Sequence, residues 1–427
     1  MQLTIVHRCS DQLRLLLRRY PLQFWLLFAG FVVNRASNGL IWPFLTIYVR
    51  EQSGAPLSHI TALFTLEALT GLLATAAIGP VMDRFGRKLV MALSLLGSGA
   101  LLVAMREAHT LEAWALLLAV YGMVIPAFTI GAHAMVADVV PEIQRPSAYA
   151  LMRIAQNVGV AVGPAVGGFL VVSAYGLTYL IAAAVNAVLG VLVLLLLAET
   201  LPKRSAAAQR SSGGYVRLLR DRAFVVFIAV LLLVEMIITL VFVLLPVYAK
   251  ENFGVLENQY GLIVTINALM VVLFQYSMTR FTQRFRPLTV IAAGALVYAV
   301  GSMTIALGST FAAFAFSMVI VTIGELMVAP TGLALTARLA PHDMRARYMG
   351  VYSITYTLAA GIAPLIGGQL NDRISPDAIW YGGLVLGVAA AAGFFLMQRA
   401  RLLPDEPAST KTKRMLAASQ AEDCDAC

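Results

Sequence analysis

The sequence predicts an all-α polytopic membrane protein, with 12 transmembrane helices in two pseudo-symmetric six-helix halves. The first observation is composition: 60% of the 427 residues are hydrophobic and only 12% are charged, whereas about a quarter of a soluble domain is charged. The second is a series of apolar stretches that approach the ~20 residues a helix needs to cross a bilayer. The third is an internal match, found when the chain is shifted by 200 residues.

Each predicted helix is an apolar run that is bounded by charged or turn-forming residues. Their apolar lengths are close to the thickness of a bilayer, which is why we predict spans rather than buried core helices. In chain order, the expected spans are residues 22–48, 57–82, 88–105, 111–137, 147–171, 178–198, 223–248, 259–281, 288–307, 311–337, 347–370 and 379–397.

A basic, polar stretch divides these spans six and six. The residues after the last span are polar and poor in aromatic side chains, which predicts disorder. The expected segments are an N-terminal arm at 1–21, a first six-helix half at 22–198, a linker at 199–222, a second six-helix half at 223–400 and a tail at 401–427.

The orientation follows from the 31 Lys and Arg residues. Arg35 and Arg153 fall within predicted helices, and most of the others lie in the arm, the linker, the tail and the loops on that side. Basic loops stay on the cytoplasmic side of a membrane, so both termini are predicted to be cytoplasmic. The net charge of +9 therefore does not indicate nucleic-acid binding. The other side holds only Arg50, Arg106, Lys250 and Arg373.

The internal match holds one offset across loops and helices. Residues 48–51 (Tyr-Val-Arg-Glu) match residues 248–251 (Tyr-Ala-Lys-Glu), and Pro164 matches Pro364 in a similar glycine-rich context. Because the same offset of 200 residues holds at positions far apart in the chain, the match indicates duplication of a six-helix unit. Two parallel six-helix repeats are one layout of secondary transporters, which bind substrate between the repeats near the bilayer midplane.

The loop between the second and third predicted helices carries the most specific motif. Residues 79–88 read Gly-Pro-Val-Met-Asp-Arg-Phe-Gly-Arg-Lys, and the two glycines allow close packing and a tight reversal. This order resembles the signature loop between helices 2 and 3 of the major facilitator superfamily, a large family of secondary transporters. The resemblance extends over about residues 22–397 and implies the major facilitator fold.

A second motif lies in the fifth predicted helix. Gly159, Gly163, Pro164, Gly167 and Gly168 resemble the Gly-x-x-x-Gly-Pro-x-x-Gly-Gly motif of the drug:proton antiporter branch of this family. Three of the glycines are four residues apart and form one close-packing stripe, while the proline loosens the helix. We expect these residues to act through helix packing. Residues 121–126 in the fourth helix carry no Arg, where that branch often has one.

Five ionisable residues fall within predicted spans: Arg35, Glu67, Arg153, Glu235 and Glu325. Each costs about 3 kcal/mol at the centre of a bilayer. A rise of about 1.5 Å per residue places all except Arg153 near one plane. We therefore predict a central polar cavity, whereas Arg153 is expected to snorkel to the inner interface in a structural role.

Within this cavity, proton coupling is assigned to Glu325, Glu235 and Glu67, since a carboxyl in a low-dielectric interior can bind and release protons. A permanently protonated, hydrogen-bonded carboxylic acid is the alternative. Arg35 is expected to pair with Glu67, either in the cavity or as a static link between two helices. The predicted lining is Arg35, Asn38, Trp42, Glu67, Glu235, Asn267, Glu325, Tyr352 and Tyr356, although ordinary helix packing is the alternative for any single aromatic residue.

The resemblance further implies an inner charge cluster that holds one conformation closed. Separate solvated charges are the alternative, because surface ion pairs contribute little. His133, near the inner end of the fourth helix, is expected to be a hydrogen-bonded packing residue. The gating residues implied by the resemblance are Gly79, Asp83, Arg84, Gly86, Arg87, Lys88, Asp138 and Arg145.

Together these features predict a secondary active transporter rather than an enzyme. The resemblance favours proton-coupled efflux of amphipathic or cationic drug-like molecules by alternating access across a bacterial cell membrane, and an aromatic, Met-rich cavity suits such compounds. The sequence has no phosphate-binding loop and no metal-ligand cluster, so no cofactor is expected. The expected partners are a small-molecule substrate, protons and the lipid bilayer, with the chain as a monomer.

Two alternatives remain open at this stage. One is a proton symporter of a small metabolite or organic anion, with Arg35 as the substrate clamp. The other, from a different class, is a membrane sensor that binds a ligand without transporting it.

Overall fold

The computed structural model describes residues 19–200, 215–341 and 344–403. Most of the predicted arm (1–18), linker (201–214) and tail (404–427) lies outside these ranges. Within them the secondary structure is entirely helical, and 12 helices are long and apolar enough to cross a membrane. The prediction of an all-α chain with twelve spans is confirmed.

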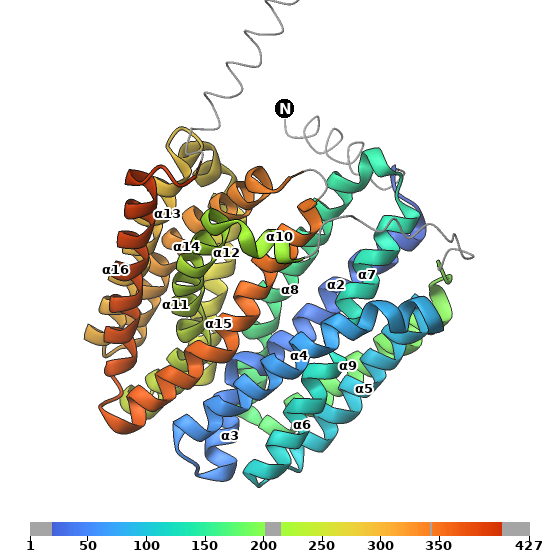
Figure 1. Cartoon of the computed structure of the whole chain (residues 1–427). Helices are drawn as coiled ribbons and strands as arrows, with labels where there is room; N and C mark the ends of the chain where they lie inside the picture. Colours follow the sequence, from blue (N-terminus) through green and yellow to red (C-terminus); the bar gives the residue numbers. More distant parts are fainter. Residues whose placement is uncertain (1–18, 201–214, 342–343, 404–427) are drawn as a thin grey trace, which may run out of the picture. The chain divides into compact units, whose positions relative to one another are not determined.

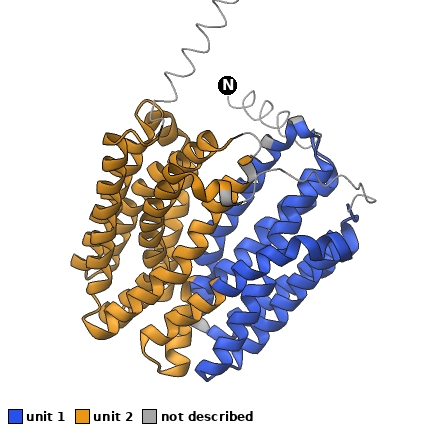
Figure 2. Cartoon of the chain, in the orientation of Figure 1, with its two compact units in different colours: residues 1–42, 69–206 blue, residues 43–68, 207–427 orange. Residues whose placement is uncertain are grey.

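The chain divides into two compact units, which Figure 2 shows in different colours. Unit 1 comprises residues 1–42 and 69–206, and unit 2 comprises residues 43–68 and 207–427. In unit 1, α2 packs against α8, and α5 packs against α9 (Figure 1). The helices of unit 1 are α2 (Leu22–Ile41), α5 (Arg87–Arg106), α6 (Leu111–Val124), α7 (Pro126–Val139), α8 (Arg145–Ser173) and α9 (Tyr175–Leu196), with the short η2 (Glu142–Gln144).

The long helix α4 (Leu57–Phe85) contributes residues 57–68 to unit 2 and residues 69–85 to unit 1. Within unit 2, α13 packs against both α14 and α16, and α11 packs against α15. The remaining helices of unit 2 are α3 (Leu45–Ser53), α10 (Tyr215–Arg220), α11 (Arg222–Phe253), α12 (Glu257–Thr282), α13 (Pro287–Leu307), α14 (Phe311–Leu339), α15 (Arg345–Arg373) and α16 (Ala378–Arg399).

The internal repeat is visible in the helix caps. The hydroxyl of Thr110 accepts a hydrogen bond from the backbone N–H three residues later at the start of α6, and Thr310 does the same at the start of α14. Gly54 ends α3 with a φ of +61°, and Gly254 ends α11 with a φ of +67°. Glycine adopts this left-handed conformation at little cost. Sequence positions 200 residues apart thus begin and end helices in the same way.

Proline interrupts two of the predicted helices. The expected span 22–48 consists of α2, the short 3-10 segment η1 (Trp42–Phe44) and α3, with Pro43 inside η1. The expected span 111–137 consists of α6 and α7, and Pro126 is the first residue of α7. A proline has no backbone N–H and clashes with the preceding turn, which accounts for breaks at these positions.

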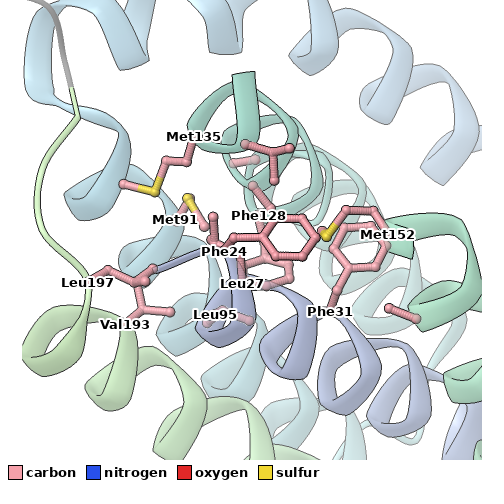
Figure 3. Packing of buried hydrophobic residues seen from close by; sticks show 14 of the residues in the cluster. Phe24, Leu27, Phe31, Met91, Leu95, Phe128, Met135, Met152, Val193 and Leu197 are labelled. Atoms are coloured by element: carbon pink, nitrogen blue, oxygen red, sulfur yellow. The ribbon is translucent and has the colours of Figure 1, made fainter. Parts of the chain in front are cut away.

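A continuous apolar core fills unit 1. Phe24, Leu27 and Phe31 project from α2 towards aromatic and methionine side chains of α5, α7 and α8 (Figure 3). The rings of Phe31 and Phe128 have centroids 6.1 Å apart, and both side chains are buried. Close packing of this kind fixes the face that α2 presents to its neighbours, and thereby the direction of the polar side chains next to Phe31.

Candidate functional site

The predicted acid Glu325 lies in a hydrogen-bonded cluster within unit 2. It projects from α14 and accepts a hydrogen bond from the side-chain amide of Asn267 on α12, with 2.7 Å between Nδ2 and Oε2. The same amide nitrogen lies 3.0 Å from Oγ1 of Thr322, one turn before Glu325 on α14. The cluster therefore places a carboxyl group, an amide and a hydroxyl together on two helices that span the membrane.

Glu235 and Tyr298 belong to the same cluster. Glu235 lies on α11, half-buried, and its carboxyl group interacts electrostatically with that of Glu325. Tyr298, buried on α13, interacts electrostatically with both carboxyl groups and with Tyr352 on α15. The structure thus brings together four of the predicted cavity residues, which are Glu235, Asn267, Glu325 and Tyr352.

Sequence reasoning did not select Thr322 or Tyr298. Thr322 precedes Glu325 by three residues, so helical spacing was a signal that could have identified it. Tyr298 offered no comparable signal, because a single tyrosine in an apolar span is typical of ordinary packing.

Three tyrosines, four residues apart on α15, occupy three different environments. Tyr348 is buried and donates a hydrogen bond to the carboxylate of Asp221, at 2.8 Å. Tyr352 is half-buried, and its hydroxyl lies 3.4 Å from the carbonyl oxygen of Ala329. Tyr356 is 60% exposed. Tyr352 interacts with Tyr298 of the acid cluster.

Unit 1 places Arg35 in a second polar group. The guanidinium lies over the ring of Phe31, with 5.3 Å between Cζ and the centroid, and its Nη2 lies 3.3 Å from Oγ1 of Thr129 on α7. His133, one turn further along α7, interacts electrostatically with Arg35. Its ring also contacts those of Phe31 and Tyr149, at centroid distances of 5.4 and 5.9 Å.

The other predicted lining residues lie near the end of α2 and on α4. Asn38 is half-buried on α2, and Trp42 is the first residue of η1. Glu67 lies on the part of α4 that belongs to unit 2. Because Arg35 belongs to unit 1, its pairing with Glu67 stays a prediction.

The signature residues 79–88 form the end of α4, the turn at Gly86 and the start of α5. Gly86 has a φ of +91°, which an L side chain would adopt only with strain. Past this turn, the backbone N–H groups of Arg87 and Lys88 donate to the two carboxylate oxygens of Glu199, at 3.1 and 3.0 Å. These N–H groups have no partner inside the helix, so Glu199 caps α5. This residue was not among those selected from the sequence.

Two of the predicted gating residues form an ion pair: Arg87 with Asp138 of α7. Arg87 also donates to the backbone oxygen of Ala134 at 3.2 Å, and Asp138 accepts a hydrogen bond from the Thr200 hydroxyl at 2.7 Å. The loop residues 86–88, α7 and the end of the first half are therefore joined through side chains.

The remaining gating candidates lie apart from this pair. Asp83 is exposed near the end of α4, and Gly79 precedes it by one turn. The Arg84 guanidinium covers the Phe85 ring, with Cζ 5.3 Å from the centroid. Arg145 donates from Nε to the backbone oxygen of Val140 at 3.2 Å, next to the last turn of α7.

The glycines of α8 lie directly against α2. A Cβ added at Gly159 would meet the Cβ of Arg35 at 2.5 Å, and one added at Gly163 would meet the carbonyl oxygen of Ala36 at 2.6 Å. At Gly167 the carbonyl oxygen of Leu40 would lie 2.5 Å away. Pro164 and Gly168 are buried in the same helix.

Twelve apolar helices, a duplicated six-helix unit and a carboxyl cluster within the spans define a multi-pass membrane protein of the secondary-transporter class. The profile of the Major Facilitator Superfamily matches residues 27–256 and 235–421. The chain belongs to this family, and it is a transporter rather than an enzyme.

Relatives within the family include exchangers and resistance proteins. The chain is 27% identical over 378 residues to the "Na(+), Li(+), K(+)/H(+) antiporter" of Planococcus maritimus, which covers 81% of this chain and 87% of that protein. It is 24% identical over 364 residues to "Multidrug resistance protein 1" of Bacillus subtilis (strain 168), covering 83% and 90%. Among solved structures, the nucleoside transporter NupG superposes with a TM-score of 0.76 at 15% identity, over 88% of this chain and 99% of that one. This last similarity shows the fold alone.

Proposed function

We propose that the protein is a proton-coupled exporter of amphipathic or cationic small molecules that works by alternating access. The observation that carries the proposal is the cluster in unit 2, where Asn267 holds the carboxyl group of Glu325 at 2.7 Å and Glu235 interacts with it. Ionisable groups within membrane spans are costly and mark ion and proton pathways. The cluster joins α11, α12 and α14. Protonation or ionisation of its carboxyl groups therefore changes the interactions between these three helices.

The chemistry of two neighbouring carboxyl groups suits exchange. When both are ionised in a low-dielectric interior they repel each other, and either a proton or a cationic ligand relieves the repulsion. A site that accepts one or the other couples the outward passage of a cation to the inward passage of protons. Tyr352, which is half-buried next to Tyr298, adds an aromatic ring for an organic cation.

The names of two relatives support the proposal. One of them is called "Multidrug resistance protein 1", and another, from Staphylococcus aureus (strain MSSA476), is called "Quinolone resistance protein NorA" and is 21% identical over 354 residues. The carboxyl cluster of this chain gives the independent physical reason for proton coupling.

The test is substrate-induced proton movement in inside-out vesicles that contain the full chain. A respiration-generated pH gradient is challenged with a panel of cationic and neutral drugs. We expect a drug to dissipate the gradient with the wild type and not with Glu325→Gln. The matched control is Glu112→Gln, which changes an exposed acid in the first turn of α6. Equal dissipation by Glu325→Gln and the wild type would contradict the proposed coupling role.

A second candidate is exchange of a monovalent metal cation for protons. Oxygen atoms of Glu235, Glu325 and Thr322 lie in one cluster, and oxygen ligands suit hard cations. The relative named as an Na(+), Li(+), K(+)/H(+) antiporter also favours this candidate. In the same vesicles, dissipation of the pH gradient by NaCl or KCl, with no response to any drug, would replace the drug-export proposal with this one.

A further inference from the structure

The polar group around Arg35 in unit 1 is not used by the proton-coupling proposal. It combines two basic side chains, Arg35 and His133, with the hydroxyl of Thr129 and the aromatic ring of Phe31. All three polar residues are half-buried and lie on spans of the membrane domain. Basic residues at such positions are costly and mark sites of function more often than not.

The packing of α2 fixes the position of the guanidinium. Phe31 is 1% exposed and packs on Phe128, which anchors the ring under Arg35 (Figure 3). On the other side, Gly159 of α8 leaves room for the first carbon of the Arg35 side chain, since an added Cβ there would come within 2.5 Å of it. Arg35 is therefore held between two helices with its charged end directed by the Phe31 ring.

The position of His133 is also fixed. Its backbone oxygen accepts a hydrogen bond from the Tyr149 hydroxyl at 3.1 Å, and its ring lies between those of Phe31 and Tyr149. This contact ties α7 to α8 beside Arg35. The residue selected from the sequence as a packing histidine thus lies in the same group as the guanidinium.

The chemistry of this group is complementary to a carboxylate. A guanidinium presents N–H donors in a planar fork that matches the two oxygens of a carboxylate. The Thr129 hydroxyl and an imidazole N–H add donors on the α7 side. The Tyr149 ring, which is 38% exposed, provides an apolar surface for the body of an amphipathic molecule.

We propose that Arg35, Thr129 and His133 bind the carboxylate group of an amphipathic aromatic compound, so that the substrates of the transporter include organic carboxylates and amphoteric molecules. The substrate class rests on the proposed function, because it presumes that the bound compound is transported. Binding itself can be measured without transport.

The test compares two fluorescent probes, dansylglycine and its uncharged amide, which differ in the carboxylate alone. Binding to the purified full-length protein is followed by dansyl fluorescence. We expect the wild type to bind the acid about tenfold or more tightly than the amide, which is the scale of a charge-assisted bidentate contact. Arg35→Gln should lose this preference, Arg35→Lys should keep part of it, and His133→Gln should reduce it.

The matched control is Arg153→Gln, which removes an exposed arginine from α8 in the same unit. It should leave the preference unchanged, and thermal unfolding verifies that every variant is folded. Equal binding of acid and amide by the wild type would overturn the proposal, as would equal weakening of both probes by Arg35→Gln. If Arg35→Gln weakens binding of dansylglycine and the added change Glu67→Gln restores it, Arg35 acts in the predicted ion pair with Glu67 instead.

Glu325→Gln separates this inference from the proposed function. If both are right, the variant retains the preference for dansylglycine and loses proton-driven transport. If only the carboxylate site is right, the preference depends on Arg35, while drug-induced proton movement is absent from the wild type as well.

Discussion

Arg50 and Glu251 form an ion pair between α3 and α11, with 2.9 Å between Nε and Oε1. The neighbouring residues form a second pair in which the base comes from the other helix: Lys250 of α11 contacts Glu51 of α3. Positions 50 and 51 correspond to 250 and 251 in the internal repeat, so each basic residue binds the acid of the other repeat. Lys250 additionally contacts Glu257, whose side chain is 5% exposed. The duplicated sequence has produced a reciprocal contact within unit 2.

Reversing one charge of this contact should destabilise the protein, and reversing both should restore it. Arg50→Glu places a third acid beside Glu51 and Glu251, and we expect it to lower the free energy of unfolding by about 1 kcal/mol, the upper range for partly exposed pairs. The double variant Arg50→Glu/Glu251→Arg should recover most of this loss. Thermal unfolding in detergent measures both, with Arg373→Glu, an exposed arginine of α15, as the control. Additive effects of the two reversals would show that the pair contributes nothing.

The packing of α8 on α2 gives a prediction about glycine. Gly163→Ala would place a Cβ 2.6 Å from the backbone oxygen of Ala36, and because that atom belongs to a helix it cannot move cheaply. We expect a loss of about 1–3 kcal/mol, as for other overpacked cores. Gly79→Ala is the control, since nothing lies within 4 Å of its added Cβ, and alanine at a helical position stabilises by up to about 1 kcal/mol. Similar unfolding temperatures for the two variants would contradict the steric explanation.

Glu199 should act as the N-terminal cap of α5. Glu199→Ala removes the acceptor of the Arg87 and Lys88 backbone N–H groups, and loss of a cap costs about 1 kcal/mol. Glu199→Gln retains a carbonyl oxygen and should lose less. Hydrogen exchange of the first turn of α5 is the direct measurement, and Glu142→Ala, an exposed acid outside this contact, is the control. Unchanged exchange in Glu199→Ala would show that the contact does not protect the turn.

The sequence predicted the helices well because the length and apolarity of each span depend on local composition. It did not predict the break of the fourth span, although Pro126 was visible, because prolines are also tolerated inside membrane helices. Pro164 and Pro330 lie within α8 and α14 without ending them. Whether a proline breaks a membrane helix depends on the helices and side chains packed against it. These tertiary neighbours cannot be read from the sequence.

The site was predictable where charge was the signal. Glu325 and Glu235 were selected because an acid in a span is costly. Asn267 lies 200 residues after Glu67, which is the offset of the internal repeat, and its amide contacts Glu325 in unit 2. Glu199 was missed because it meets Arg87 from 112 residues away. An exposed acid at the end of a helix has many possible partners, and tertiary packing selects among them.

The interaction between Asn267 and Glu325 leads to the last prediction. Asn267→Ala removes the amide that donates to the carboxyl group at 2.7 Å, and a hydrogen bond to a charged group is worth about 1.5–3 kcal/mol. If the proposed function is right, drug-induced proton movement should fall by about tenfold or more, and loss of the buried amide should also lower the unfolding temperature. Asn258→Ala, at the half-buried second residue of the same helix α12, should leave transport unchanged. Because the Thr322 hydroxyl also contacts Asn267, Thr322→Val should give a smaller decrease than Asn267→Ala. Equal decreases in both variants would indicate that Asn267 acts by holding α12 against α14 rather than by controlling the carboxyl group.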